Sequence, residues 1–594
     1  MLSDRRKKAL MKLAAAEPSA EAWRTLCERL SKLKRAEVSS DLLGDLDAQM
    51  GDRWPDSLRA TMCGMKWDED MLAGRHDPRH LLVRTLRYDK YFSGRYTGLM
   101  IRSPDHVAGS IARSKAPQHW TQLRSIRLSH QNLSDADVRA IAKAPLPHLR
   151  HLALTDISVA ALEAICQAPW AKQLEDLSFN IKGDGDAAFM ALAEAPFERL
   201  NKLYVGDTKP RETGAERFAQ SKQMPALTSL SFGSVPLSAS VLRALSTGLH
   251  ALRELSLYKC NVNAQRLHAL LEDTHLSLCE LRLDINPLGD EGARVLAAFG
   301  DGIESLSMDR VGMTDNGMEA LASSPKLRRL KSLKMCKGWG ETRENKLTGR
   351  GLTALLDSAY LSHLSELELE GSFESIDGGL LGGLEALVLR GAGAGIDFGR
   401  LGRALGSGLR RLELSDCGMD AAGADALFER LIVEELETVK LSKNRLGAVA
   451  FGRLQHAPKL NALHLDHCGL GADDIAPLLE SHARPERVYL DHNPLGDEGV
   501  MRLAASPFIS ETLHLGLNET GVTCRGAVAL AHSPHMERAE RVFLENNQIG
   551  DEGALELAKR VKRGGGWMNV TLYNNDYGAE AEAVLKKTPP RCCP

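Results

Sequence analysis

The apolar residues of this chain follow one short pattern that returns through most of its length. The pattern is Leu-x-x-Leu-x-Leu-x-x-Asn-x-Leu, followed by glycine and a helical run, and clear copies lie at 278–292, 488–499 and 542–553. Its alternating apolar residues predict a short strand with one buried face, and its Ala- and Leu-rich run predicts an amphipathic helix. A fixed period of this length predicts stacked repeats, each packed on its neighbours.

Eighteen units can be placed in this way, and most begin 24 to 29 residues after the one before. The first apolar position degrades near the C-terminus, but the inner apolar pair persists. The units begin at Leu123, Leu149, Leu174, Leu200, Leu227, Leu252, Leu278, Ile303, Leu330, Leu364, Leu384, Leu409, Leu436, Leu460, Pro485, Ser510, Ala539 and Trp567. We divide them into a first block at 123–363 and a second block at 364–585, with a flexible tail at 586–594.

Two irregularities interrupt the array near its middle. Residues 337–346 form an insertion in the first block, and 371–408 is rich in glycine. We interpret both as loops on the helical side of the solenoid. The alternative is a bend in the solenoid, or an inserted loop that presents Trp339 to a partner.

The segment before the repeats has a different pattern. Residues 1–95 lack the repeat, and Trp23, Leu26 and Leu30 fall on one helical face, so we expect a small helical domain. A further helix is expected to start near Asp41 and to run through Met50. Residues 96–122 are expected to cap the exposed end of the first repeat.

The recurring features of one unit have simple physical reasons. Asn286 follows a strand, where a buried amide can satisfy backbone groups that would otherwise lack partners. Cys468 occupies the same position in another unit, where its thiol is expected to fill the space and bond more weakly.

These repeats, with Asn-x-Leu or Asn-x-Ile before Gly-Asp-Glu-Gly, resemble the ribonuclease-inhibitor-like subfamily of leucine-rich repeats. The resemblance covers about 123–585. It implies an α/β leucine-rich-repeat solenoid, a curved horseshoe with a parallel sheet on the concave face and helices on the convex face. The helical segment and cap also resemble an arrangement of bacterial leucine-rich-repeat proteins, which points to a bacterial origin. The fold alone does not assign a function, because such folds host many.

Composition narrows the class of partner. The formal net charge is −3, with 75 basic and 78 acidic residues, which disfavours a nucleic-acid partner. No stretch approaches the roughly 20 apolar residues of a membrane span, and the N-terminus lacks the apolar core of a secretory signal. We therefore expect a cytoplasmic protein without a membrane partner. Its 11 cysteines, an odd number, are expected to remain reduced.

No catalytic motif emerges from the chain. It has no phosphate-binding loop, no G-x-S-x-G sequence and no paired CxxC with zinc spacing. We therefore expect no enzymatic activity, no cofactor and no metal.

The outward residues of the C-terminal strands form the candidate partner site. Neighbouring strands lie about 4.8 Å apart, so side chains at equivalent positions should form one surface. It combines aromatic, acidic and polar groups, and aromatic residues are enriched among binding hot spots. The candidates are His464, Asp466, His467, Tyr489, Asp491, His492, His514, Phe543, Glu545 and Tyr573.

The N-terminal strands present a different surface. Their central outward positions carry serines, with Arg127 and His151 near the start. Farther on, a basic stretch around Lys334 meets an acidic stretch around Glu368, and the two are expected to neutralise each other in part.

The sequence thus predicts a non-enzymatic scaffold that binds a protein partner on its concave surface. One alternative is a sensor or regulatory subunit of a bacterial signalling or defence complex, in which the N-terminal helices contact an effector. Another is a metal-dependent hydrolase that uses His464, Asp466 and His492. A GTPase regulator remains as a family analogy without a residue that marks it.

Overall fold

The structure is a computed structural model that contains two compact units, 1–286 and 287–594. It describes residues 4–18, 20–31, 33, 40–50, 53–54, 85–89, 123–129, 133–272, 276–336, 344–373, 379–391, 393, 395–448, 451–454, 456–563, 569–586 and 592–593. The expected cap at 96–122 and most of the insertion, 337–343, lie outside the described residues.

The first unit begins with three helices, α1 (Asp4–Ala14), α2 (Ala20–Ser31) and α3 (Ser40–Met50). Their shared core includes Trp23 and Trp54, whose ring centroids lie 6.3 Å apart. The indole of Trp54 also donates to the carbonyl of Ala14 at 3.0 Å, which fixes the end of this segment on α1.

The remainder of the first unit alternates strands and helices. Its strands are β1 (Thr85–Asp89), β2 (Ser125–Ser129), β3 (His151–Ser158), β4 (Asp176–Lys182), β5 (Lys202–Gly206), β6 (Ser229–Gly233), β7 (Glu254–Tyr258) and β8 (Glu280–Arg282). Its further helices are α7 (Asp135–Lys143), α8 (Val159–Cys166), η5 (Ala171–Gln173), α9 (Gly185–Glu194), α10 (Glu212–Ala219), α11 (Ala239–Gly248) and α12 (Ala264–Leu271). Each strand pairs in parallel with the next one along the chain.

The second unit continues the same alternation. Its strands are β9 (Ser305–Ser307), β10 (Ser332–Met335), β11 (Glu366–Glu370), β12 (Ala386–Arg390), β13 (Arg411–Ser415), β14 (Thr438–Lys440), β15 (Ala462–His464), β16 (Arg487–Tyr489), β17 (His514–Gly516), β18 (Arg541–Phe543), β19 (Asn569–Thr571) and β20 (Cys592–Cys593). Its helices are α13 (Gly289–Phe299), α14 (Asp315–Ala322), η6 (Pro325–Leu327), α15 (Gly349–Leu356), η7 (Gly379–Gly383), α16 (Phe398–Ala404), α17 (Ala421–Arg430), α18 (Phe451–Leu454), α19 (Ala476–Leu479), α20 (Gly496–Ala505), η9 (Pro507–Ile509), α21 (Cys524–His532), α22 (Asp551–Arg563) and α23 (Ala579–Lys586).

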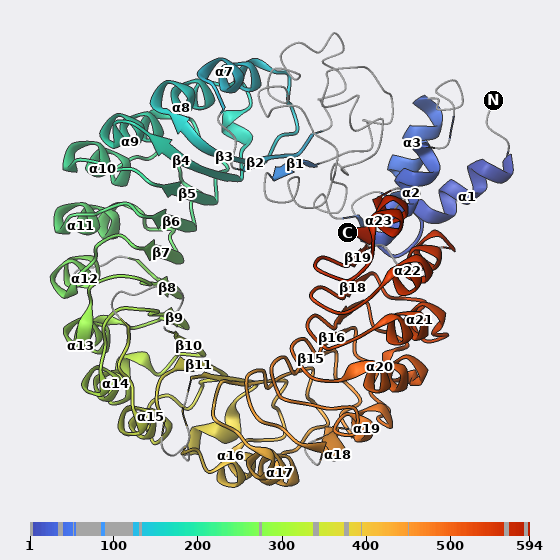
Figure 1. The fold of residues 1–594 in the computed structure, drawn as a ribbon. Helices are drawn as coiled ribbons and strands as arrows, with labels where there is room; N and C mark the ends of the chain where they lie inside the picture. The colour runs from blue at the N-terminus through green and yellow to red at the C-terminus, as the bar shows by residue number, and fades with distance from the viewer. Residues whose placement is uncertain are drawn as a thin grey trace. The chain divides into compact units, whose positions relative to one another are not determined.

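In both units the strands lie side by side on one face and the helices cover the other, as Figure 1 shows. Strands β2 to β19 lie in the eighteen units placed from the sequence, one in each. The predicted fold class, a leucine-rich-repeat solenoid with a parallel sheet, is confirmed.

Two short strands lie where the sequence interpretation placed other structure. β1 lies within the segment assigned to the helical domain, yet it pairs with β2 through Thr85 and Ser125. β20 lies within the segment assigned to a flexible tail, and Cys592 is paired with Val570 of β19. Each unit therefore has one strand in addition to its repeat strands, β1 in the first and β20 in the second.

Buried asparagines join successive repeats. The Asn493 side chain is fully buried, and its Oδ1 accepts from the backbone N–H groups of Cys468 and Leu470 at 2.9 and 3.0 Å. Its Nδ2 donates to the carbonyls of Leu465 and Leu490 at 2.8 and 2.9 Å. Asn286 makes the equivalent bonds, which confirms the role predicted for it. Each amide satisfies backbone groups of two units and holds them in register.

Where cysteine replaces this asparagine, its thiol forms longer and weaker hydrogen bonds, as predicted. The Cys468 thiol donates to the carbonyls of Leu441 and Asp466 at 3.3 and 3.5 Å. Burial raises the pKa of this thiol to about 12, so it remains protonated.

The residue before this Asn or Cys, or before the Ile, Val or Thr that replaces it, takes a left-handed conformation in most units. The side chain at this turn lies at the end of the strand, and it is at least partly exposed in every unit except that of the buried Arg310. The residues concerned are Asp156, Asp207, Ser234, Lys259, Ile285, Arg310, Asp416, Lys443, His467, His492, Glu519, Asn546 and Asn574. They form a row at the strand exits, where two of the predicted site residues, His467 and His492, lie.

Within the described ranges, no helix has the length and apolar character that crossing a bilayer requires.

Candidate functional site

The ten residues predicted for the partner site lie on, or directly after, five successive strands of the second unit, β15 to β19. Four lie on the strands themselves: His464, Tyr489, His514 and Phe543. The other six follow a strand directly: Asp466, His467, Asp491, His492, Glu545 and Tyr573. All ten are at least partly exposed. We call this set the C-terminal face, and the strand register arranges it in rows.

The first row consists of aromatic rings. His464 is paired with Tyr489 in the register, and their rings stack with centroids 4.6 Å apart. Tyr489 and Phe543 lie farther apart, with centroids at 6.4 Å. The strand between them carries Gly516 at the same position. These separations lie within the range in which aromatic pairs attract each other.

Gly516 makes this arrangement possible. A Cβ at this position would lie 2.3 Å from Asp491 Oδ2 and 2.8 Å from Tyr489 Cδ1. Because glycine has no side chain, the ring of Tyr489 can lean over β17 toward Phe543. The result is one continuous ring surface over four strands.

The second row contains two neighbouring carboxyl groups. Asp491 Oδ1 accepts from the backbone N–H of Asn518 at 2.7 Å, and Ser442 donates to Asp466 Oδ2 at 2.9 Å. Burial and the hydrogen-bonded Asp466 carboxyl raise the pKa of Asp491 to about 7. Asp466 Oδ1 is buried without a hydrogen-bond partner. Asp491 therefore keeps a proton at a pH at which an ordinary aspartate has lost it.

The third row lies at the strand exits. The imidazoles of His467 and His492 stack with centroids 3.8 Å apart. His492 Nδ1 lies 2.9 Å from Glu519 Oε2, and Asn546 donates to Glu519 Oε1 at 3.1 Å. This chain of contacts continues to Asn574, which donates to Asn546 at 2.7 Å.

Three histidines of the C-terminal face favour the neutral form. Burial lowers the pKa of His464, and Lys440 lowers it further. Burial and the neighbouring His492 lower the pKa of His467. Burial lowers the pKa of His514, with Arg541 and Arg487 adding to the effect. At neutral pH these side chains act as uncharged rings.

The sequence interpretation missed several residues that shape this face. Gly516, Asn518 and Glu519 all lie on the strand between Tyr489 and Phe543 and at its exit. Their positions relative to the buried Leu515 and Leu517 match those of residues that were selected in other units. Their offset within the repeat could have identified them. They were missed because the candidates were chosen mainly for aromatic, His and Asp side chains.

The face does not have the geometry of a metal site. Among the described residues, no group of three or more His, Cys, Asp or Glu side chains is arranged to hold an ion. The hydrolase alternative based on His464, Asp466 and His492 thus gains no support from the structure.

The middle strands of the second unit carry charged groups that pair with one another. Lys334 lies 3.4 Å from Glu368, which confirms that the basic and acidic stretches neutralise each other in part. Glu413 is buried and accepts from Arg390 at 2.6 Å. Burial would raise the pKa of Glu413, but the bond from Arg390 and the nearby cations lower it overall. These groups already satisfy one another without a partner.

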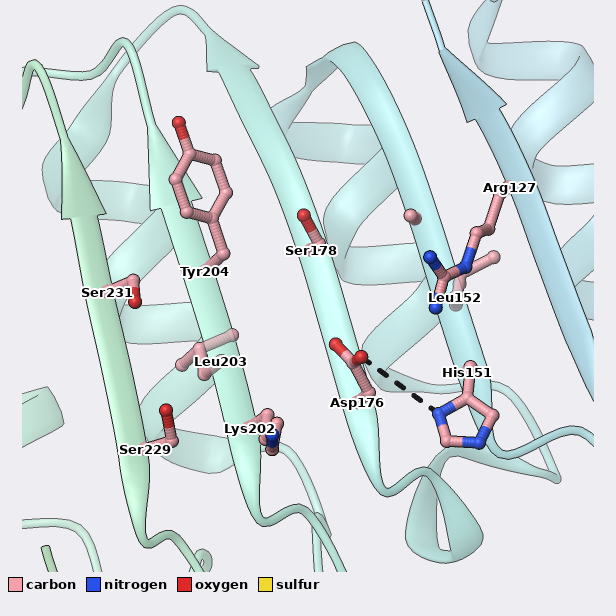
Figure 2. A pocket seen from close by; sticks show the side chains of 11 residues that line it. Arg127, His151, Leu152, Asp176, Ser178, Lys202, Leu203, Tyr204, Ser229 and Ser231 are labelled. Atoms are coloured by element: carbon pink, nitrogen blue, oxygen red, sulfur yellow. Dashed lines mark ion pairs between the residues drawn. The ribbon is translucent and has the colours of Figure 1, made fainter. Parts of the chain in front are cut away.

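The first unit has a hollow that the sequence interpretation did not identify. It has a volume of about 310 Å³ and lies on the outward side of β2 to β6 (Figure 2). We call it the N-terminal hollow. It is lined by Arg127, His151, Leu152, Ala153, Asp176, Ser178, Lys202, Leu203, Tyr204, Ser229 and Ser231.

The register explains why this surface is hollow. Tyr204 is flanked by Ser178 and Ser231 on the neighbouring strands. Its ring leans toward the strand ends, as Figure 2 shows. The Tyr204 hydroxyl lies 2.7 Å from a Cβ built on Gly206 and 2.3 Å from one built on Gly233. The serines do not fill the space that the ring leaves behind.

Comparison with known proteins supports the repeat architecture. The family model "Leucine Rich repeat" matches residues 409–428, 486–504 and 544–558. The three matched segments lie in three of its repeats. It is 28% identical to the ribonuclease inhibitor of Sus scrofa over 442 residues, which cover 70% of this chain and 86% of that protein. It is 26% identical to the inhibitor of Mus musculus over 496 residues, which cover 78% of this chain and 97% of that protein.

A shorter similarity links the chain to a larger protein. It is 30% identical to nucleotide-binding oligomerization domain-containing protein 2 of Bos taurus over 124 residues, 20% of this chain and 12% of that protein. These mammalian relatives agree with the predicted resemblance to ribonuclease-inhibitor-like repeats. They give no support to the bacterial origin.

Proposed function

We propose that this protein is a binding scaffold that captures a protein partner on the strand side of its repeats, with the C-terminal face at the centre of the contact. The observation that carries this proposal is the stacked ring surface of His464, Tyr489 and Phe543, which is held open to solvent. Nothing in the proposal requires catalysis, a cofactor, a nucleic acid or a membrane.

The rings are well suited to bind a protein. Aromatic side chains in partly buried surroundings dominate the energetics of many protein interfaces. Tyr489 is held by His464 on one side and by the space above Gly516 on the other. Little rotamer entropy is therefore lost when a partner covers it.

The backbone below the rings is also held firmly. The buried amides of Asn493 and Asn547 bond to backbone groups of neighbouring repeats under this face. The strands therefore present a preformed surface, which lowers the cost of binding.

We also propose a reducing, cytoplasmic setting. Eight cysteines between Cys27 and Cys524 are free thiols, and six of these eight are buried. Burial raises the pKa of Cys260 to about 12 and keeps its thiol in the unreactive form.

The proposal is tested by parallel capture with immobilised protein and quantitative mass spectrometry. The wild-type chain is compared with the Tyr489→Ala/Phe543→Ala double variant. We expect a partner enriched at least about a hundredfold by the wild type over the variant, in line with the loss of two hot-spot residues. A Tyr360→Ala variant serves as control, because Tyr360 is exposed between α15 and β11, outside the strand surface. Equal capture by both proteins would refute the proposal.

A second candidate function follows from the similarity to ribonuclease inhibitors. Those proteins are named for inhibition of a ribonuclease, and this chain aligns with 86% of the Sus scrofa protein. An activity assay of a purified ribonuclease, titrated with this protein, tests the candidate. Inhibition at an equimolar ratio supports it. Full activity at excess protein refutes this candidate and leaves the scaffold proposal to its own test.

The sensor-subunit alternative depends on the N-terminal helices. A truncation that keeps β1 tests it, because β1 pairs with the repeat sheet. Loss of an effector from the captured complex on removal of α1 to α3 would favour this alternative. Retention of every captured protein would oppose it.

A further inference from the structure

We infer that the N-terminal hollow is a second contact site, which receives a carboxylate side chain, Asp or Glu, projecting from a protein partner. The inference rests on the proposed function only in taking the occupant to be part of a protein. Its site lies wholly within the first unit and shares no residue with the C-terminal face.

Charge is the first reason. The hollow is lined by two cationic groups, Arg127 and Lys202, and neither has an ion-pair partner among the described residues. Its one carboxylate, Asp176, lies 4.0 Å from His151 Nδ1. Two cations against one carboxylate leave one net positive charge, apart from any proton on His151. A single carboxylate matches that charge, whereas a doubly charged group would meet Asp176 with greater repulsion.

Reach is the second reason. Arg127 is on β2 and Lys202 is on β5, so three strand spacings separate them, about 14 Å of backbone. Both side chains are long and exposed, and Figure 2 shows the guanidinium of Arg127 extended across β3. A group placed over β3 and β4 lies between the two cations. A guanidinium can bind a carboxylate with two parallel hydrogen bonds.

The polar wall is the third reason. His151 Nδ1 is buried without a hydrogen-bond partner, which is costly unless a ligand or water completes it. The hydroxyls of Ser178, Ser229 and Ser231 also border the space. A volume of about 310 Å³ exceeds that of one acidic side chain and lies at the small end of the range for ligand pockets. The hollow therefore has room for one projecting side chain, while the backbone of the partner stays outside it.

The test uses the full chain with histidine labelled by carbon-13 and nitrogen-15. N-acetylglutamate methylamide is titrated at low salt, and the ring signal of His151, assigned with a His151→Gln variant, reports binding. The glutamine analogue and inorganic phosphate are titrated in parallel. We expect a saturable shift with the glutamate compound and none with its glutamine analogue.

The Arg127→Gln/Lys202→Gln double variant should weaken the glutamate compound at least about fivefold, because two exposed ion pairs are lost. A Lys182→Gln/Arg266→Gln variant removes the same charge elsewhere in the first unit and should bind as the wild type does. Equal melting temperatures of the two variants show that folding is preserved.

Three results would overturn the inference. They are the absence of a saturable shift with the glutamate compound, an equal shift with the glutamine analogue, and a shift with phosphate alone. Each leaves the capture experiment on the C-terminal face unaffected, so failure of one proposal can be told from failure of the other.

Discussion

The N-terminal hollow and the C-terminal face share one local arrangement, but it has opposite results in the two places. In both, a tyrosine on a strand leans over glycine: Tyr204 over Gly206 and Gly233, and Tyr489 over Gly516. Around Tyr204 the neighbouring positions carry serine, so the tilt leaves a polar hollow. Around Tyr489 they carry His464 and, beyond Gly516, Phe543, so the tilt closes a ring surface. The repeat fixes where side chains emerge, and the size of their neighbours decides whether a cavity or a contact surface forms.

Replacing the glycines by alanine should give the largest difference between the two regions, measured as a loss in the free energy of unfolding. In Gly516→Ala, the new Cβ would meet Asp491 and the body of the Tyr489 ring. We expect a loss of about 1–3 kcal/mol in the free energy of unfolding, because the ring row must shift. In Gly233→Ala, the nearest atom is the Tyr204 hydroxyl at the free end of the ring, so the loss should remain below about 1 kcal/mol.

Denaturant unfolding of both variants measures these losses. Gly452→Ala is the control, because a Cβ there meets nothing within 4 Å. A Gly233→Ala variant that loses as much stability as Gly516→Ala would remove the distinction between a filled and an open surface.

The raised pKa of Asp491 gives the next largest expected effect, and it belongs to the C-terminal face alone. The folded-state pKa of Asp491 is raised from 3.8 to about 7, so the folded chain holds the Asp491 proton more tightly than the unfolded chain. The contribution to stability is fully present below the unfolded pKa and is lost as the pH rises through about 7.

An Asp491→Asn variant tests this linkage. Its amide can donate to Asp466 and accept from Asn518 without a proton. The variant should therefore exceed the wild type in stability by on the order of 1–2 kcal/mol at pH 8, with the difference vanishing near pH 4. Thermal melting across this range provides the measurement. A difference that does not change with pH would show that the pKa of Asp491 is not raised in the folded chain.

The sequence predicted the repeat architecture and the location of the C-terminal face. The period fixes each strand, and the offset from the buried leucines fixes which residues point outward, so His464, Tyr489 and Phe543 could be grouped without a structure. The N-terminal hollow could not be found in this way. It depends on the tilt of Tyr204, which two glycines on two strands permit, and on the unpaired state of Arg127 and Lys202.

The raised pKa of Asp491 could not be predicted from the sequence for the same reason. Asp466 and Asp491 repeat at one offset, but their contact depends on burial and on the bonds from Ser442 and Asn518. β1 was also missed, because its five residues lie far from the first repeat in sequence and become part of the sheet only through pairing with β2.

The strand-exit row should give the smallest effect. His492 and Glu519 form an exposed pair at 2.9 Å, with side-chain exposures of 33% and 47%. We expect Glu519→Gln to change the free energy of unfolding by less than about 0.5 kcal/mol, because exposed ion pairs contribute little. Urea unfolding at neutral pH measures it. A loss above about 1 kcal/mol would make this row part of the structural core of the face.

Photo-crosslinking tests the central claim, that a protein partner binds the C-terminal face, most directly. Tyr573 on this face and Tyr360 outside the strand surface are almost equally exposed, at 43% and 42%, so they form a matched pair. A photoreactive phenylalanine is introduced at each position in turn. The complex of each variant with the captured partner is then irradiated. The account predicts a crosslink from position 573 and none from position 360. A crosslink from position 360 alone would contradict it.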